Sequence, residues 1–293
     1  MRVAALLAVV CGLVACGGSG TVATAPASNR ATPSQTQVGH VSIGGLARPY
    51  VVFQPSSLSA RQKAPLLVAM HAYTTDVGWM ESNTHFDDLA ARAGFVVVYP
   101  QGIGNAWNAG RCCGHDANDD VTFIKDVVDQ LVAQGRVDPK RVYATGMSNG
   151  GFMAQRLACE APDRFAAVAS VSGSLVTDSC SPSRAISVLE MHGLQDDVVP
   201  YNGGVVGGLA YFPPTASNMQ QWATRQGCTA GPATTTDGIT TTSTWTLCRD
   251  GATVMLDAIA GAGHSWFSPA EMQGEPDASQ TVWNFFSHAP PLP

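Results

Sequence analysis

Short apolar runs alternate along the chain with longer segments in which apolar residues recur every three to four positions. The runs are nearly continuous, as in Phe95-Val96-Val97-Val98, which is typical of strands buried on both faces. The longer segments have the periodicity of amphipathic helices. Regular alternation of the two predicts an α/β fold with a mostly parallel central sheet and helices on both faces.

The expected elements lie within one stretch of about 250 residues, a length that suits a single α/β domain. The predicted strands cover residues 41–43, 49–53, 66–70, 95–99, 142–145, 166–171, 186–191 and 253–259, and the predicted helices cover 86–93, 121–134, 152–159, 216–226 and 279–287. The Thr-rich span 234–246 is interpreted as a surface hairpin. Asp119 and Asp120 are expected to cap the second helix, because negative charge there meets the helix dipole.

The charge balance excludes one class of partner. The formal net charge is −6, and the lysines are Lys63, Lys125 and Lys140, with no basic cluster. A nucleic-acid partner is therefore not expected, because such proteins present a basic patch or stripe to the phosphates.

A serine stands at a predicted strand-to-helix turn. The segment Gly146-Met147-Ser148-Asn149-Gly150-Gly151 follows the run Arg141-Val142-Tyr143-Ala144 and precedes a helix-like stretch. This context is typical of a nucleophile elbow, in which a sharp turn lifts the serine hydroxyl clear of the sheet. Because such a pattern also arises by chance in a chain rich in Gly and Ser, it needs partners elsewhere.

The partners follow in the order Ser, Asp, His, which is that of α/β-hydrolases. Asp196 and Asp197 come just after the apolar run 186–191, and His264 lies in the Gly-rich loop that follows residues 253–259. The three predicted catalytic residues are Ser148 as nucleophile, His264 as general base and Asp196 as the acid that orients it. Asp197 is the alternative acid, because only one of two adjacent side chains can face the histidine.

These segments resemble a known family. The elbow context 142–151, the run 157–168, the block 192–201 and the tetrad Gly263-His264-Ser265-Trp266 are similar to the polyhydroxybutyrate depolymerase and feruloyl esterase group of secreted serine esterases, and to a branch of mycobacterial lipoprotein esterases. The likeness covers roughly residues 48 to 287. In that family the acid is the Asp of a His-Gly-x-x-Asp segment, which is Asp196 here.

The resemblance also implies the oxyanion donors. The family places one donor after a strand like Pro65–Met70, which implies the N–H of Tyr73, and the other is the N–H of Asn149 after the nucleophile. The chain departs from the family at Ala72, where Gly is usual, and a turn that required positive φ there would be strained. His71 is expected to form structural hydrogen bonds behind this loop.

Two tryptophans are candidates for the substrate pocket. Trp107 lies in the Gly-rich segment 101–119 that follows a strand, and Trp266 lies two residues past the histidine. Loops at the carboxyl ends of strands commonly build active sites. Core packing is the alternative interpretation of Trp266.

The N-terminus predicts an exported protein. Residues 1–15 match a bacterial lipoprotein signal, with a positive Met1-Arg2, an apolar stretch 3–14 and the cleavage pattern Leu13-Val14-Ala15-Cys16. The apolar stretch is too short to span a bilayer as a mature helix. The resemblance implies that Cys16 is lipidated and anchors the protein to the outer face of the plasma membrane; a plain signal peptide and secretion is the alternative. Residues 16–39, rich in Gly, Ser, Thr, Ala and Pro, then form a flexible tether, and 40–293 form the catalytic domain.

Six cysteines remain after Cys11 leaves with the signal and Cys16 takes lipid. An exported domain with six cysteines predicts three disulfides. The hypothesis pairs Cys159 with Cys180 and Cys228 with Cys248, each of which would link a helix or loop to the next strand region. The adjacent residues Cys112 and Cys113 remain, and their closure would be strained. A zinc site helped by His115 is the less favoured alternative, because two separated C-x-x-C pairs are lacking.

The sequence therefore predicts a lipid-anchored serine carboxylesterase that needs no metal or organic cofactor. Its candidate substrates are short-chain acyl esters, hydroxycinnamoyl or acetyl esters of polysaccharides, and hydroxyalkanoate oligomers. A serine peptidase and an inactive cell-envelope binding lipoprotein are the alternatives, since the first uses the same triad and the second would tolerate the departure at Ala72.

Overall fold

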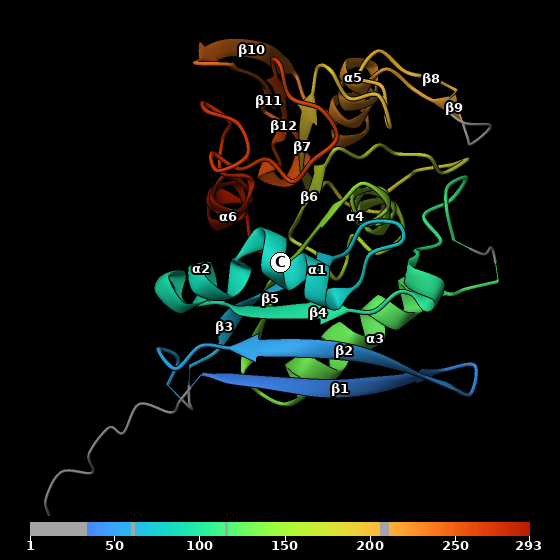
Figure 1. Cartoon of the computed structure of the whole chain (residues 1–293), viewed down its shortest axis with the longest axis vertical. Helices are drawn as coiled ribbons and strands as arrows, with labels where there is room; N and C mark the ends of the chain where they lie inside the picture. The colour runs from blue at the N-terminus through green and yellow to red at the C-terminus, as the bar shows by residue number, and fades with distance from the viewer. Residues whose placement is uncertain (1–33, 60–61, 115–116, 206–210) are drawn as a thin grey trace, which may run out of the picture. The chain divides into compact units, whose positions relative to one another are not determined.

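A computed structural model describes residues 34–59, 62–114, 117–205 and 211–293 (Figure 1). The predicted signal peptide 1–15, the predicted lipidation site Cys16, most of the predicted tether and His115 lie outside these ranges. No helix among the described residues is long and apolar enough to cross a membrane.

A ten-stranded sheet organises the described part of the chain. Its strands, in spatial order, are β1 (Gln35–Ile43), β2 (Leu46–Gln54), β4 (Val96–Pro100), β3 (Ala64–Met70), β5 (Val137–Met147), β6 (Ala167–Val171), β7 (Ser187–Gly193), β12 (Val254–Ile259), β11 (Thr240–Thr246) and β10 (Ala230–Asp237). The run from β4 to β12 is parallel, and the hairpins β1–β2 and β10–β11 extend its two edges in antiparallel fashion. The predicted, mostly parallel sheet is confirmed.

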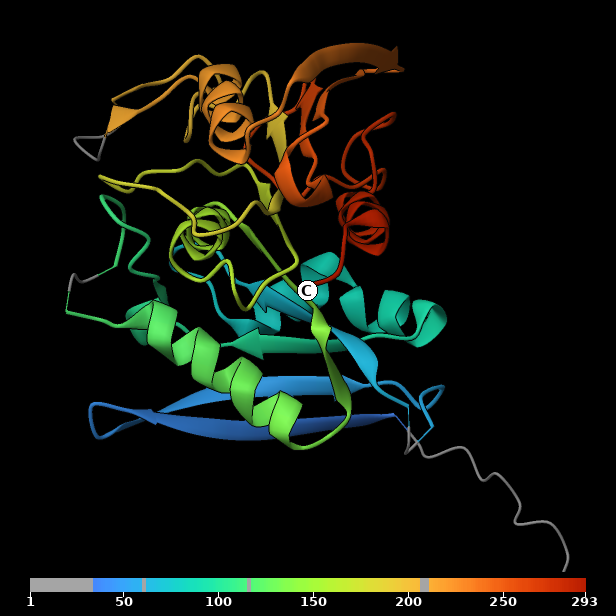
Figure 2. The ribbon, with the colours of Figure 1, turned by 180° about the vertical axis from the view of Figure 1, so that it is seen from behind.

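Helices cover both faces of this sheet, as predicted. The helices are α1 (Val77–Thr84), α2 (Phe86–Ala93), α3 (Asp120–Ala133), α4 (Asn149–Glu160), α5 (Thr215–Gln226) and α6 (Ala278–His288). Helices α1, α2 and α6 lie in front of the sheet in Figure 1, and α3, α4 and α5 face the viewer in Figure 2. Strand β3 is buried along its whole length and alternates between them, with Leu66 and Val68 in the core of one face and Leu67 in that of the other. Burial on both faces explains why the central strands are continuous apolar runs.

Several elements of the structure differ from those that the sequence predicts. Strand β1 begins at Gln35, five residues before the predicted start of the domain at residue 40. Helix α1 was not predicted, nor were the short strands β8 (Gly204–Val205) and β9 (Tyr211–Phe212). The predicted Thr-rich hairpin exists as β10–β11, but it joins the main sheet through β11 and β12.

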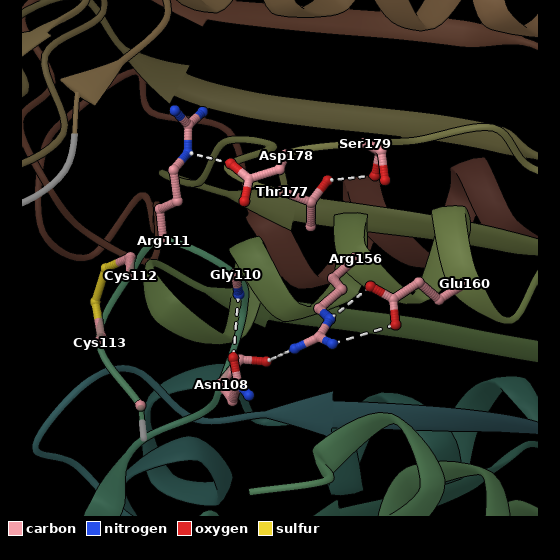
Figure 3. A pocket seen from close by; sticks show the side chains of 11 residues that line it. Asn108, Gly110, Arg111, Cys112, Cys113, Arg156, Glu160, Thr177, Asp178 and Ser179 are labelled. Atoms are coloured by element: carbon pink, nitrogen blue, oxygen red, sulfur yellow. Dashed lines mark hydrogen bonds and ion pairs between the residues drawn. A yellow bond between two sulfur atoms is a disulfide. The ribbon is translucent and has the colours of Figure 1, made fainter. Parts of the chain in front are cut away.

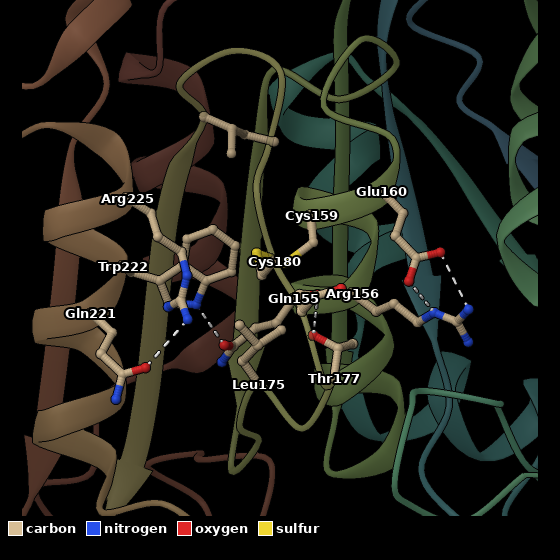
Figure 4. Close-up of a disulfide and its surroundings, with 12 residues drawn as sticks. Gln155, Arg156, Cys159, Glu160, Leu175, Thr177, Cys180, Gln221, Trp222 and Arg225 are labelled. Carbon is tan, nitrogen blue, oxygen red and sulfur yellow. Dashed lines mark hydrogen bonds and ion pairs between the residues drawn. A yellow bond between two sulfur atoms is a disulfide. The ribbon is translucent and has the colours of Figure 1, made fainter.

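Three disulfides link the six cysteines in the pairs that the sequence predicted. Cys159 at the end of α4 bonds Cys180 in the loop after β6 (Figure 4), Cys228 bonds Cys248, and the adjacent Cys112 and Cys113 bond each other. All six thiols are therefore used in disulfides, and the zinc alternative loses its thiolates.

Candidate active site

Ser148 occupies the turn between β5 and α4. Its backbone angles are φ 52° and ψ −116°, and its N–H donates to the carbonyl of Val171 on β6 at 2.8 Å. A positive φ is uncommon for a residue with a side chain, and such strain is typical of functional sites. The turn therefore has the backbone geometry of the predicted elbow.

Two glycines make this turn sterically feasible. A Cβ atom at Gly146 would overlap the backbone of Gly150, and one at Gly150 would overlap the carbonyl oxygens of Met70 and His71. Strand β5, helix α4 and strand β3 thus approach one another at a distance that admits no side chain at these positions.

His264 and Asp196 meet at the carboxyl ends of two neighbouring parallel strands. Strands β7 and β12 pair in register, with Gly193 opposite Ile259, so the loops that follow them leave the sheet side by side. A Cβ at Gly193 would overlap the carbonyl oxygens of Ala262 and Gly263, so a glycine is needed where the two loops cross.

The contact between these side chains is a hydrogen bond of 2.7 Å from His264 Nδ1 to Asp196 Oδ2. The other oxygen, Oδ1, accepts the N–H groups of Val198 at 2.9 Å and Val199 at 2.8 Å, which fixes the carboxylate plane. Asp196 is buried, whereas the alternative acid Asp197 is exposed. Because Nδ1 donates to the carboxylate, Nε2 of His264 is left to accept a proton.

Ser148 and His264 both line an apolar cavity of about 300 Å³. Its remaining lining comes from segments far apart in the sequence: Ala72, Tyr73, Thr75, Trp79, Cys112, Cys113, Met147, Phe152, Val198, Val199 and Phe212. The disulfide between Cys112 and Cys113 forms part of the wall. The segment 101–119, in which the sequence predicts part of the pocket, contributes Cys112 and Cys113, and Tyr73 is the predicted oxyanion donor.

Both candidate pocket tryptophans are core residues and neither lines this cavity, which for Trp266 is the alternative interpretation. Trp107 is fully buried, and its indole N–H donates to the carbonyl of His71 at 2.9 Å. Trp266 is 4% exposed, donates to Ser279 Oγ at 3.0 Å and packs edge-on against Phe86. In both cases the indole nitrogen finds a buried acceptor, which allows a large apolar ring to be buried.

The loop after β3 carries the predicted oxyanion donor. Ala72 has no positive φ; in this loop Thr74 has one, at 64°. The strain expected at Ala72 is therefore absent. Among the described residues, no acceptor bonds the N–H of Tyr73, and the N–H of Asn149 belongs to the first turn of α4, where helices lack intrahelical acceptors.

His71 supports this loop from behind, as expected. Its Nε2 accepts the N–H of Gly102 at 3.0 Å, and its Nδ1 donates to the carbonyl of Ala72 at 2.8 Å. Burial lowers the pKa of His71, which keeps the ring neutral and suited to this pair of contacts.

A polar groove of about 610 Å³ lies on the other side of the Cys112–Cys113 disulfide (Figure 3). Arg156 in its wall bonds Glu160 at 2.8 Å and the carbonyl of Asn108 at 2.6 Å, and Arg111 lies 3.5 Å from Asp178. The cations of the groove are therefore paired with carboxylates or carbonyls, and the groove offers hydrogen-bonding groups without a strong net charge.

Comparison with known proteins places these features in a family. The sequence profile of the family described as Esterase PHB depolymerase matches residues 49–213, which include Ser148 and Asp196. Feruloyl esterase B of Piromyces equi is 34% identical over 231 residues, covering 74% of this chain and 42% of that enzyme, so the chain spans less than half of that relative's length. NocK of Nocardia uniformis subsp. tsuyamanensis is 30% identical over 301 residues, covering 89% of this chain and 88% of NocK.

The fold has counterparts among solved structures. The acetyl xylan esterase from Aspergillus awamori superposes with a TM-score of 0.63 at 18% identity, covering 86% of this chain and all of that one. The sheet, the covering helices and the element order are thus those of an α/β-hydrolase.

Proposed function

The chain belongs to the Esterase PHB depolymerase family, and we propose that within it the protein is a serine carboxylesterase that works through an acyl-enzyme intermediate. Ser148 attacks the ester carbonyl carbon while His264 Nε2 takes the hydroxyl proton, and Asp196 stabilises the imidazolium that forms. The departing alcohol takes this proton. Water then attacks the acyl-enzyme by the same route and releases the acid.

One observation carries this proposal: His264 Nδ1 lies 2.7 Å from Asp196 Oδ2 beside the cavity that also contains Ser148. The N–H groups of Asn149 and Tyr73 are the proposed donors to the oxyanion. Their availability supports this role, because each such donor contributes about 3 to 4 kcal/mol to the stability of a tetrahedral intermediate.

The test is the hydrolysis of 4-nitrophenyl esters by the wild type and by Ser148→Ala. We expect the substitution to lower kcat by at least about 10³-fold, because no other group can form the acyl-enzyme. Ser287→Ala on α6 is the matched control, since that exposed hydroxyl bonds only its own helix and the neighbouring His288. A peptide amide of the same acyl group tests the peptidase alternative, and a folded wild type that turns over neither substrate would support a binding lipoprotein.

The two neighbouring pockets favour an ester between an apolar acyl group and a hydroxyl-rich alcohol. The apolar cavity at Ser148 suits the acyl group, and the polar groove beyond the disulfide suits sugar hydroxyls. Acetyl or hydroxycinnamoyl esters of polysaccharides therefore fit better than hydroxyalkanoate oligomers, whose repeating units are alike on both sides of the scissile bond.

Filling the groove tests this assignment. Ser179→Trp places a large ring in the groove wall, away from the apolar cavity. We expect it to raise KM about tenfold for a feruloyl or acetyl sugar ester, the equivalent of about 1.4 kcal/mol. The 4-nitrophenyl ester of the same acid should be unaffected, and so should both substrates in the control Ser287→Trp. Equal effects on both esters would refute the assignment.

We propose in addition that the enzyme is exported and anchored by lipid at Cys16. Three disulfides support an oxidising compartment. Metabolic labelling with a fatty acid is the test, and the label should be lost in Cys16→Ala. A label that persists in this variant would contradict the anchor.

A further inference from the structure

Two buried titratable side chains lie side by side on one face of β7, the strand that leads into the loop of Asp196. Glu190 and His192 are two positions apart on β7, so they leave the strand on the same face. Glu190 is 1% exposed and His192 is fully buried. Buried groups of this kind are stable only when they are paired and hydrogen-bonded, so their contacts indicate what they do.

Glu190 is fixed from three directions. Its Oε1 accepts the N–H of Gly173 at 3.0 Å and lies 2.9 Å from His192 Nδ1. Its Oε2 accepts from Gln155 Nε2 on α4 at 2.9 Å. Gln155 in turn accepts the indole N–H of Trp222 on α5 at 2.8 Å (Figure 4). The carboxyl group therefore has no freedom to rotate away from the imidazole.

His192 turns its other nitrogen toward the acid loop. Nε2 lies 2.8 Å from the carbonyl of Val199 and 3.4 Å from Asp196 Oδ2. A carbonyl oxygen can only accept, so Nε2 carries a proton. Burial by itself would lower the pKa of His192, but the hydrogen bond and charge of Glu190 outweigh it and the pKa is raised. The ring of Tyr201, with its centroid 5.9 Å from that of His192, is a further titratable group against it.

The loop that carries Asp196 is held at Val199 through both of that residue's backbone groups. The N–H of Val199 donates to Asp196 Oδ1, and the carbonyl of Val199 accepts from His192. The remaining oxygen of Asp196, Oδ2, faces both His192 and His264. His192 therefore contacts both the carboxylate, at Oδ2, and Val199, whose N–H holds Oδ1.

We propose that His192, held by Glu190, is a positioning residue that aims the Asp196 carboxylate at Nδ1 of His264. The inference rests on the proposed function, because it concerns the acid of the same site. Misplacing a catalytic group by about 1 Å can lower the rate on the order of 100-fold.

Three variants separate the parts of this proposal. His192→Phe keeps a ring and removes both nitrogens, and we expect kcat to fall about 10- to 100-fold. His192→Gln keeps a donor for the Val199 carbonyl and should recover most of that loss. Glu190→Gln keeps the shape and removes the charge, and kcat should fall about tenfold, as expected for the loss of a hydrogen bond to a charged group. Rates are expressed per active site counted by burst titration, so that unfolded protein does not enter them.

The pH profile distinguishes positioning from a merely structural role. A carboxylate that is aimed less well stabilises protonated His264 less, so the acid limb of kcat/KM in His192→Phe should move to lower pH. The low-field proton resonance of His264 Nδ1–H should shift in the same variant. Asp257→Asn on β12 is the matched control, because this buried carboxyl lies on the neighbouring strand opposite Met191 and accepts a hydrogen bond from Thr242 on β11; the acid limb of this variant should stay in place.

The outcomes are distinct. If His192→Phe and His192→Gln lose activity equally, or if the acid limb and the resonance do not move, the positioning role is overturned. A wild type without ester turnover would overturn the proposed function, and the resonance would still report whether His192 orients Asp196.

Discussion

The stability of the fold should depend on a buried ion pair that the sequence interpretation did not recognise. The sequence predicts Asp119 and Asp120 as caps of α3, and the N-cap is Asp119, whose side chain accepts the N–H of Thr122 at 2.9 Å. Asp120 is fully buried and bonds Arg48 on β2 at 2.5 Å. The guanidinium lies 3.7 Å from the ring centroid of Phe123.

Removing one partner leaves the other as an uncompensated buried charge, which typically costs about 3 to 5 kcal/mol. Arg48→Met should lower the free energy of unfolding by an amount near the lower end of this range, about 3 kcal/mol. Asp120 keeps the N–H of Asn108 at 2.7 Å and the N-terminal dipole of α3, and burial raises the pKa of its carboxyl, so it can also take a proton. Asp120→Asn should cost about 4 kcal/mol, because a guanidinium cannot neutralise itself and its contact with Phe123 contributes only about 1 to 2 kcal/mol.

Urea unfolding at pH 7 measures these costs, with Arg48→Met/Asp120→Asn completing the cycle. The double variant removes both charges together, and we expect its stability to lie within about 1 kcal/mol of the wild type. The matched control is Asp138→Asn, which removes the carboxylate of the half-exposed ion pair with Arg141 and should cost less than about 1 kcal/mol. If the two single effects simply add in the double variant, the interpretation of Arg48 and Asp120 as a coupled buried pair is wrong.

Three further results are expected. The pKa values of both Glu190 and His192 are raised on folding, so the stability that each contributes is present at low pH and is lost as pH rises through its folded value. The free energy of unfolding should fall above about pH 4.5 through Glu190 and above about pH 6.5 through His192, by up to about 1.4 kcal/mol per pH unit for each group, and a flat urea midpoint would contradict this. Asp196→Asn should lower kcat about 10⁴-fold, whereas Asp197→Asn should change it less than about twofold, and the reverse order would move the acid to Asp197. Val198→Trp at the exposed side of the cavity should lower kcat/KM for hexanoyl esters about tenfold relative to acetyl esters without changing stability, and equal effects on both would remove Val198 from the acyl pocket.

The residues of the proposed triad could be identified from the sequence because each occupies a position that nearby residues reveal. The elbow needs glycines where β5, α4 and β3 crowd together, and Gly146 and Gly150 meet that need within five residues of each other. His264 and Asp196 stand at strand ends, and strand ends can be recognised from the apolar runs alone. Their meeting then follows from the parallel order of the sheet, which brings consecutive loops to one edge.

The pocket could not be predicted in the same way, because it depends on packing between distant segments. Trp79 lies on α1, whose apolar residues do not form a single stripe, so no helical pattern was visible there. Phe212 belongs to a two-residue strand. Trp107 has the expected position after a strand, but its indole N–H donates to the carbonyl of His71. The ring therefore packs in the core and does not line the cavity. Position along the chain identified the loops, and only tertiary contacts determined which side chains line the cavity.

Glu190 and His192 are polar residues that an apolar pattern makes easy to overlook in the sequence. The run 186–191 has the apolar pattern of a buried strand, yet it contains a glutamate, and a histidine follows it. A charged residue in a buried strand is more informative than the apolar residues around it, because it is retained only with partners. Those partners come from α4, from the loop after β6 and from Val199, so no local pattern could have named them. Two titratable residues on one face of a central strand, just before the loop of the proposed acid, therefore indicate a second layer of polar contacts behind that acid.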